Sequence, residues 1–123
     1  MRTFGARSQA ALVGVHPDLI RVAEAALQAS TYDFAITEGL RSIERQRELV
    51  AKGFSRTLES KHLDGRAVDI MAVGDLNGDG VRDHRDKSIT WDRGIYTEIA
   101  LAWFRVSMDL DVRIRWGGSF AGF

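Results

Sequence analysis

Apolar residues recur along this chain with two different periods. From Pro17 onward they lie three or four positions apart, and Pro17 suits the first position of a helix, where its missing N–H would be unpaired in any case. A second segment of mostly helical spacing extends from a capping residue, Thr90, to Asp109. The apolar positions are Leu19, Ile20, Val22, Ala23, Ala26 and Leu27 in the first segment and Ile95, Ile99, Leu101, Ala102, Phe104, Val106 and Met108 in the second. The apolar face of each predicted helix indicates packing in the core rather than a catalytic or binding role.

Shorter patterns predict strands and one more helix. Residues 32–41 predict a short strand that runs into a glycine turn, and residues 42–52 predict a helix that a glycine ends. Residues 67–71 form an apolar run that is typical of a strand and is interrupted only by Asp69. Residues 112–116 alternate between apolar side chains and arginines, which predicts a half-buried strand.

Composition limits the classes of protein to consider. The chain has 123 residues, of which 45% are hydrophobic, so we expect one globular domain with a single core. Lysine and arginine together number 17, as do aspartate and glutamate, so no net basic charge argues for a nucleic-acid partner. The absence of cysteine excludes disulfides and thiolate metal sites. No apolar run approaches the roughly 20 residues of a membrane span, and the polar first twenty residues predict no signal peptide.

One short segment carries more chemistry than the rest. His62 and Asp69 stand seven positions apart, across Gly65, and Asp69 lies inside a predicted strand. Zinc binds imidazole nitrogen and carboxylate oxygen, and a catalytic zinc takes about three protein ligands and leaves one position open. The pair therefore predicts part of a zinc site. Taken alone, such a pair is more often a surface histidine and a buried or capping carboxylate.

The residues around this pair favour the metal interpretation. Ser60, His62, Gly65, Ala67 and Asp69 follow the pattern Ser-x-His-x-x-Gly-x-Ala-x-Asp without a gap. This is similar to the signature of the D-Ala-D-Ala carboxypeptidase (VanY-like) family of zinc peptidases, and it resembles most the L-alanyl-D-glutamate peptidases that phages use as endolysins. The resemblance covers roughly residues 4–120. It implies an α+β fold in which a short antiparallel sheet packs with helices, with residues 1–123 forming a single catalytic domain.

A second block of residues resembles the same family. Arg41, Ser42 and Gln46 fall where the family has a Gly-x-Arg-Ser-x-x-x-Gln stretch. Arg41 is then the candidate catalytic residue, either gripping a substrate carboxylate with its planar guanidinium or stabilising the oxyanion. Gln46 and Ser60 are implied to orient substrate or ligands. Taken alone, Arg41 would be as well explained as a surface arginine near the start of a helix.

Residues 75–86 predict a calcium-binding loop of EF-hand type, inserted after the predicted strand that contains Asp69. Oxygen-bearing side chains occupy loop positions 1, 3, 5, 9 and 12, and glycine occupies position 6. The expected calcium ligands are Asp75, Asn77, Asp79, the carbonyl group of Val81, Asp83 and Asp86. Position 12 is aspartate where a bidentate glutamate is usual, and a strand is predicted before the loop, so we expect only the second half of an EF-hand. We also expect calcium to modulate activity, because it would order the chain that leads away from Asp69.

The third zinc ligand and the general base are not found among these residues. The resemblance implies that an acidic general base and, three residues later, a histidine ligand follow shortly after a Trp-Gly-Gly segment. Residues 116–118 match this segment, but only five more residues follow them, and neither the acid nor the histidine is among them. His16 is expected to lie at a helix entry and His84 in the calcium loop, so neither is expected to replace the missing ligand. The 123 residues are therefore expected to lack a C-terminal segment, to bind zinc weakly and to show little or no catalysis.

The resemblance implies a zinc-dependent peptidoglycan hydrolase that cleaves the L-Ala-D-Glu bond of the stem peptide during host lysis. We expect a monomer that waits in the host cytoplasm and reaches the cell wall or periplasm after holin-type release. Two alternatives stay open for function, namely a D-Ala-D-Ala carboxypeptidase and a calcium-binding module that kept the fold and lost the chemistry. A dockerin-type module is a weaker alternative because dockerins carry two such loops and this chain has one.

Overall fold

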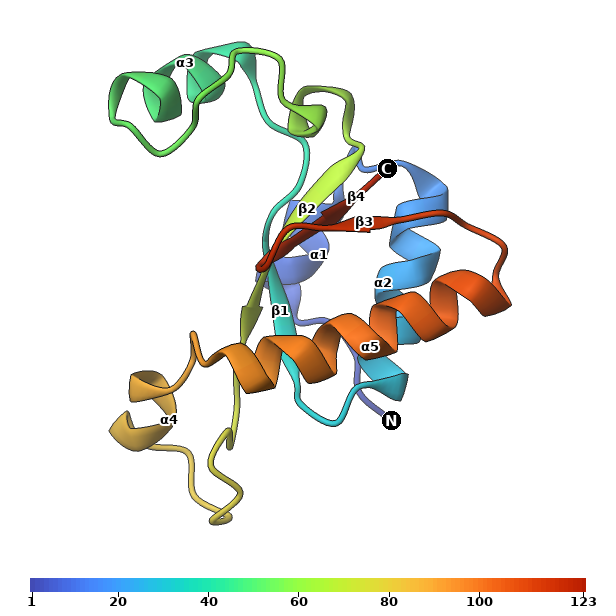
Figure 1. The fold of residues 1–123 in the computed structure, drawn as a ribbon, viewed down its shortest axis with the longest axis vertical. Coiled ribbons are helices and arrows are strands. Elements are labelled where there is room, and N and C mark those ends of the chain that lie inside the picture. The colour runs from blue at the N-terminus through green and yellow to red at the C-terminus, as the bar shows by residue number, and fades with distance from the viewer.

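The computed structural model describes all 123 residues as an α+β fold with one four-stranded sheet (Figure 1). In chain order the helices and strands are α1 (Ala6–Leu12), α2 (Pro17–Ala29), β1 (Phe34–Glu38), α3 (Ile43–Ala51), the short 3-10 helix η1 (Lys61–Asp64), β2 (Ala67–Ala72), α4 (His84–Ser88), α5 (Arg93–Asp109), β3 (Arg115–Trp116) and β4 (Phe120–Gly122). The strand order is β1-β2-β4-β3, and every neighbouring pair is antiparallel. The predicted fold class and short antiparallel sheet are confirmed.

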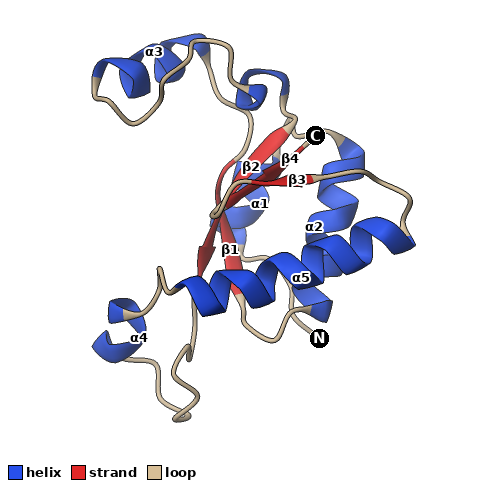
Figure 2. Ribbon diagram, in the orientation of Figure 1, coloured by secondary structure: helices blue, strands red, loops and turns tan.

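The two faces of the sheet have different surroundings. Helices α1, α2 and α5 pack together with one face, while α3 projects beyond one end of the sheet and α4 beyond the other (Figure 2). On β2 the side chains of Val68 and Ile70 are fully buried in the helix-covered core, whereas Asp69, between them, is only partly buried. Since successive side chains of a strand point to opposite faces, Asp69 belongs to the face without helices.

The core lies between the sheet and the long helices. A single cluster of 20 buried residues joins α1, α2, β1, β2 and α5. Trp103 on α5 is completely buried and packs against the rings of Phe34 and Trp116. This core makes the sheet a rigid base for the residues on its other face.

Most predicted elements are confirmed, with three corrections. The cap of α5 is Asp92, whose carboxylate accepts a hydrogen bond from the N–H of Ile95, so the prediction of Thr90 was wrong. Thr90 instead donates its hydroxyl hydrogen to the carbonyl oxygen of Ala72. The predicted strand 112–116 is ordered as a strand only at its last two residues. Helix α1 and strand β4 were not predicted.

None of the helices combines the length and the apolar character that a membrane span requires.

Candidate functional site

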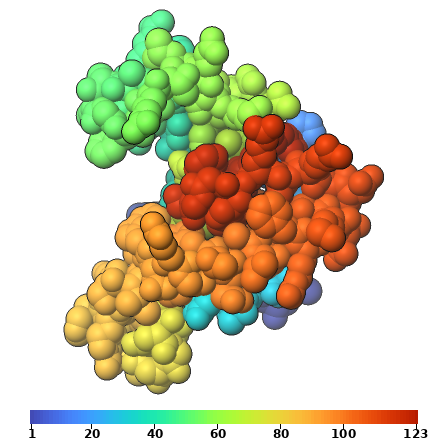
Figure 3. All heavy atoms as spheres, in the orientation of Figure 1, coloured from blue at the N-terminus to red at the C-terminus, as the bar shows by residue number.

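A pocket of about 680 Å³ lies on the open face of the sheet, beside the segment that carries α3. Its lining comes from the four strands, the turn before α3, α3 itself, the loop after α3, η1 and the last residue of the chain. In the space-filling view the surface is indented between the green segment around α3 and the red C-terminal segment (Figure 3). The pocket brings together Arg41, Ser60, His62 and Asp69, which lie up to 28 positions apart in the chain.

His62 and Asp69 meet in this pocket. The Nδ1 atom of His62 lies 2.8 Å from the carbonyl oxygen of Gly39, which can only accept, so Nδ1 carries the hydrogen. The Nε2 atom of a neutral His62 ring is then an acceptor, and it lies 3.3 Å from Oδ1 of Asp69. Two acceptors facing each other need a proton or a metal ion between them. This donor set fits zinc, since a histidine that binds metal through one nitrogen usually donates its other N–H to a carbonyl or carboxylate.

The turn before β2 places His62 on the pocket floor. Ser60 caps η1 by accepting a hydrogen bond from the backbone N–H of His62, so its hydroxyl is used locally at the pocket edge. Gly65 ends η1 with a left-handed φ of 67°, a conformation that favours glycine. A Cβ atom at Gly65 would also lie 2.3 Å from the carbonyl oxygen of Gly14. Two features therefore favour glycine at this position of the motif, namely the left-handed turn and the close contact with the backbone of Gly14.

Arg41 is almost fully buried and makes three side-chain contacts. Its Nε atom lies 2.9 Å from a carboxylate oxygen of Glu38, and its two terminal nitrogens lie 2.8 Å from Oε1 of Gln46 and 3.1 Å from Oδ2 of Asp69. The guanidinium group thus holds the carboxylate oxygen of Asp69 that does not face His62. Of its five N–H donors, three are engaged within the protein.

Gln46 holds Arg41 by accepting a hydrogen bond from its guanidinium group. Its side chain is completely buried, does not line the pocket, and donates from Nε2 to the hydroxyl group of Ser55 and the carbonyl oxygen of Thr57. Both ends of the amide are therefore used inside the protein, and the geometry gives Gln46 a positioning place behind Arg41 rather than a surface that faces substrate. Glu38 was missed by the sequence interpretation, although its place at the end of a predicted strand could have indicated it.

The two remaining histidines lie elsewhere. His16 caps α2 by accepting a hydrogen bond from the N–H of Asp18, as its predicted place at a helix entry requires. His84 begins α4 and is exposed. Neither lines the pocket, and no group of three or more histidine, cysteine or acidic side chains lies close enough to hold a metal ion.

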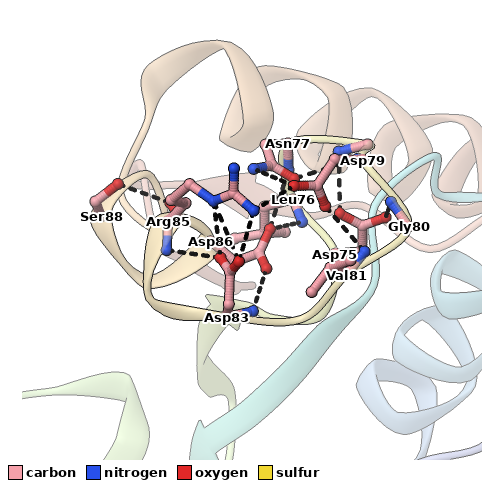
Figure 4. Close-up of polar contacts among 11 residues, drawn as sticks. Asp75, Leu76, Asn77, Asp79, Gly80, Val81, Asp83, Arg85, Asp86 and Ser88 are labelled. Carbon is pink, nitrogen blue, oxygen red and sulfur yellow. Dashed lines mark hydrogen bonds and ion pairs between the residues drawn. The ribbon is translucent and has the colours of Figure 1, made fainter.

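The predicted calcium ligands share one loop, but in this structure their carboxylates are engaged by the protein itself (Figure 4). Asp75 accepts hydrogen bonds from the N–H groups of Gly78 and Gly80, and Asp79 accepts one from Val81. The buried Asp86 accepts from the N–H groups of Leu76, Asn77 and Asp83. These contacts give the loop an ordered set of hydrogen bonds.

Arg85 supplies a positive charge within the same loop. One of its terminal nitrogens lies 3.0 Å from Asp79 and 2.7 Å from Asp83 (Figure 4). The side-chain hydrogen bond from Arg85 holds the pKa of Asp83 below its usual value, and the pKa of Arg85 is raised in turn. The backbone N–H of Asp83 is the main cause that lowers the pKa of Asp86. Through its ion pairs with Asp79 and Asp83, Arg85 thus offsets part of the negative charge of the four carboxylates that would face a calcium ion.

Comparisons with known proteins indicate one family. The sequence profile of the phage L-alanyl-D-glutamate peptidases matches residues 1–122. An L-alanyl-D-glutamate peptidase of Escherichia phage T5 is 30% identical over 121 residues, which are 95% of this chain and 80% of the phage protein. The crystal structure of the Serratia marcescens L-Ala D-Glu endopeptidase ChiX superposes with a TM-score of 0.80 at 39% identity, covering 98% of this chain and 88% of that one. The chain therefore belongs to the phage L-alanyl-D-glutamate peptidase family.

Proposed function

We propose that this protein is a zinc-dependent endopeptidase that cleaves the L-Ala-D-Glu bond of the peptidoglycan stem peptide during host lysis. The observation that carries this proposal is the His62–Asp69 pair on the floor of the pocket, with the histidine tautomer set by Gly39 and the carboxylate held by Arg41. Its phage relative and the ChiX endopeptidase carry the same bond specificity in their names. Release to the cell wall by a holin-type factor belongs to the same proposal.

His62 and Asp69 would hold the zinc ion through Nε2 and Oδ1. Zinc bound there would polarise the scissile carbonyl group and make a water molecule more acidic. His62 and Asp69 supply two of the about three protein ligands that a catalytic zinc usually takes, and the other acidic side chains that line the pocket are Glu38 and Glu59. No third histidine, cysteine or acidic side chain lies close enough to share a metal ion with the pair. These 123 residues alone would then bind zinc weakly and turn over slowly.

Arg41 orients the metal-binding carboxylate and offers its remaining N–H donors to the substrate. Glu38 and Asp69 already balance its single positive charge with two negative ones. A third carboxylate would be repelled there, whereas a carbonyl oxygen that gains negative charge as it is attacked could accept a hydrogen bond. The geometry thus favours oxyanion stabilisation over substrate-carboxylate binding for Arg41, with Gln46 as its positioning residue and Ser60 at the pocket edge.

The direct test is digestion of purified peptidoglycan by the full-length gene product, followed by mass spectrometry of the products. We expect new N-terminal D-glutamate and new C-terminal L-alanine, and we expect zinc chelation to stop the reaction. Release of free D-alanine instead would support the carboxypeptidase alternative. A zinc-loaded full-length protein that released neither product would favour the non-catalytic alternative.

Calcium binding at residues 75–86 is part of the proposed function. A calcium ion would have to displace Arg85 from Asp79 and Asp83, so the arginine and the ion compete for the same oxygens. We expect calcium, but not an equal concentration of magnesium, to raise the melting temperature and the activity, since calcium takes more oxygen ligands.

Arg85→Gln should tighten calcium binding about two- to five-fold, because an exposed ion pair of this kind is weak. Titration of the wild-type and variant proteins by calorimetry measures this change. Arg82→Gln is the matched control, since Arg82 lies in the same loop and forms no ion pair there. Equal calcium affinities in all three proteins would contradict the competition between Arg85 and calcium, and no binding to any of them would contradict the calcium site.

A further inference from the structure

Arg115 is a cation in the pocket that has no partner within the protein. Its side chain lines the pocket and is exposed, and it forms no hydrogen bond or ion pair. Arg41, by contrast, is buried and bound on three sides. The pocket therefore contains one arginine that is committed to the protein and one that is free to bind an anion.

The strand pairing places Arg115 on the same face as the metal-binding residues. Arg115 on β3 is paired with Gly122 on β4, and Gly122 is paired with Ala67 on β2. Asp69 follows two positions after Ala67, so its side chain points to the same face as that row. Gly122 contributes no side chain and Ala67 only a methyl group, so the floor between Arg115 and β2 is low.

A larger residue could not easily replace this glycine. A Cβ atom at Gly122 would lie 2.5 Å from the carbonyl oxygen of Arg66 and 3.1 Å from the Cβ atom of Ala67. The close packing of β2 and β4 thus keeps the row from Ala67 through Gly122 to Arg115 free of large side chains. Phe120, which is paired with Asp69, lines the pocket beside this row. The row leaves room for an extended peptide to lie across the strands, from the metal-binding pair toward Arg115.

The substrate of the proposed function brings a suitable anion. Glutamate has two carboxyl groups, and only one of them continues the peptide, so the other stays free close to the scissile bond. A planar guanidinium group can bind a carboxylate through two parallel hydrogen bonds. We propose that Arg115 binds the free carboxylate of the D-glutamate on the leaving side of the scissile bond and so sets specificity for glutamate; this inference rests on the proposed function.

Lys61 is the other unpaired cation that lines the pocket. It lies on η1, directly before His62, whereas Arg115 lies across β4 from β2. An ammonium group is a compact charge with no planar fork, so it matches a carboxylate less well in geometry. Lys61 is therefore a competing candidate that the experiment has to separate from Arg115.

The test compares two peptides that differ in one charge. The probes are N-acetyl-L-Ala-D-Glu-L-Lys-amide, linked through the glutamate side chain, and the same peptide with the free α-carboxylate converted to a carboxamide. Binding to the full-length protein is measured by calorimetry, so the result does not require turnover. The variants are Arg115→Gln, Lys61→Gln and Arg113→Gln. Arg113 is the matched control because it is an exposed arginine two positions away that does not line the pocket.

We expect the wild-type protein to bind the carboxylate peptide about ten-fold more tightly than the carboxamide peptide, as a charge-assisted pair predicts. Arg115→Gln should remove this preference, whereas Arg113→Gln and Lys61→Gln should keep it. Thermal melts check that Arg115→Gln remains folded, which its exposed position makes the expected result.

Three results would overturn the inference. They are a preference that survives Arg115→Gln, a preference that is lost in Lys61→Gln instead, and equal binding of the two peptides by the wild-type protein. In each case the product analysis of digested peptidoglycan decides the proposed function separately. An enzyme that cleaves the L-Ala-D-Glu bond without a charge preference would keep its function and lose this role of Arg115.

Discussion

His62→Ala is expected to lower both zinc affinity and peptidase activity of the full-length enzyme by more than about 100-fold. Changes to residues that merely support a metal ligand typically cost 10- to 100-fold, so the loss of a ligand should cost more. The fold should remain, because His62 stands on a short turn outside the hydrophobic core cluster. Zinc affinity is measured by competition with a chromophoric chelator, and activity by the clearing of peptidoglycan suspensions.

His84→Ala provides the control for this experiment. The residue is an exposed histidine at the start of α4 and does not line the pocket. The variant should retain wild-type zinc affinity. Zinc binding that survives His62→Ala, or that is lost in His84→Ala, would refute the proposed metal site.

Arg41→Ala is expected to cause the second large effect, a loss of both stability and turnover. Removing the guanidinium group leaves Glu38, Gln46 and Asp69 without their common partner. Breaking a buried ion pair by removing one partner costs about 3–5 kcal/mol, and the partial exposure of both carboxylates should reduce the loss of unfolding free energy to about 2–3 kcal/mol. Turnover should fall because Asp69 is no longer held. Urea denaturation and steady-state kinetics measure the two losses.

Arg45→Ala is a matched control, since Arg45 also forms an ion pair with Glu38 but is largely exposed. Exposed ion pairs contribute little, so we expect a much smaller change in stability and no change in turnover. Arg41→Lys should fall between the two because it keeps the charge and loses the fork. If Arg41→Ala and Arg45→Ala had equal effects, the network around Arg41 would not have the positioning role given to it.

The sequence predicted those parts of the fold whose patterns are local. Helix α2 was predicted from its apolar period and from Pro17, which is indeed its first residue, and α3 begins after the predicted Ser42. Strand β4 was missed because Gly117 and Gly118 precede it and its three residues show no clear alternation. Its existence depends on pairing with β2, a contact that spans more than 50 positions of the chain.

The candidate site could be predicted only in part, for a similar reason. His62 and Asp69 belong to one short motif, and the structure places them in one pocket. The partners of Arg41 could not be inferred from spacing, since Gln46 is buried by the fold of the loop after α3. For the calcium loop, the spacing of the side chains fitted an EF-hand, but it could not predict that Arg85 forms ion pairs with Asp79 and Asp83. These contacts are visible only in the structure.

The position of β4 has a consequence for biosynthesis. This strand is inserted between β2 and β3, so the central pairing of the sheet uses residues 120–122. During translation, one edge of β2 stays unpaired until these residues emerge from the ribosome, and the wall of the pocket that includes Arg115 and Phe120 is absent until then. The pocket is therefore incomplete during translation until almost all of the described residues have been synthesised.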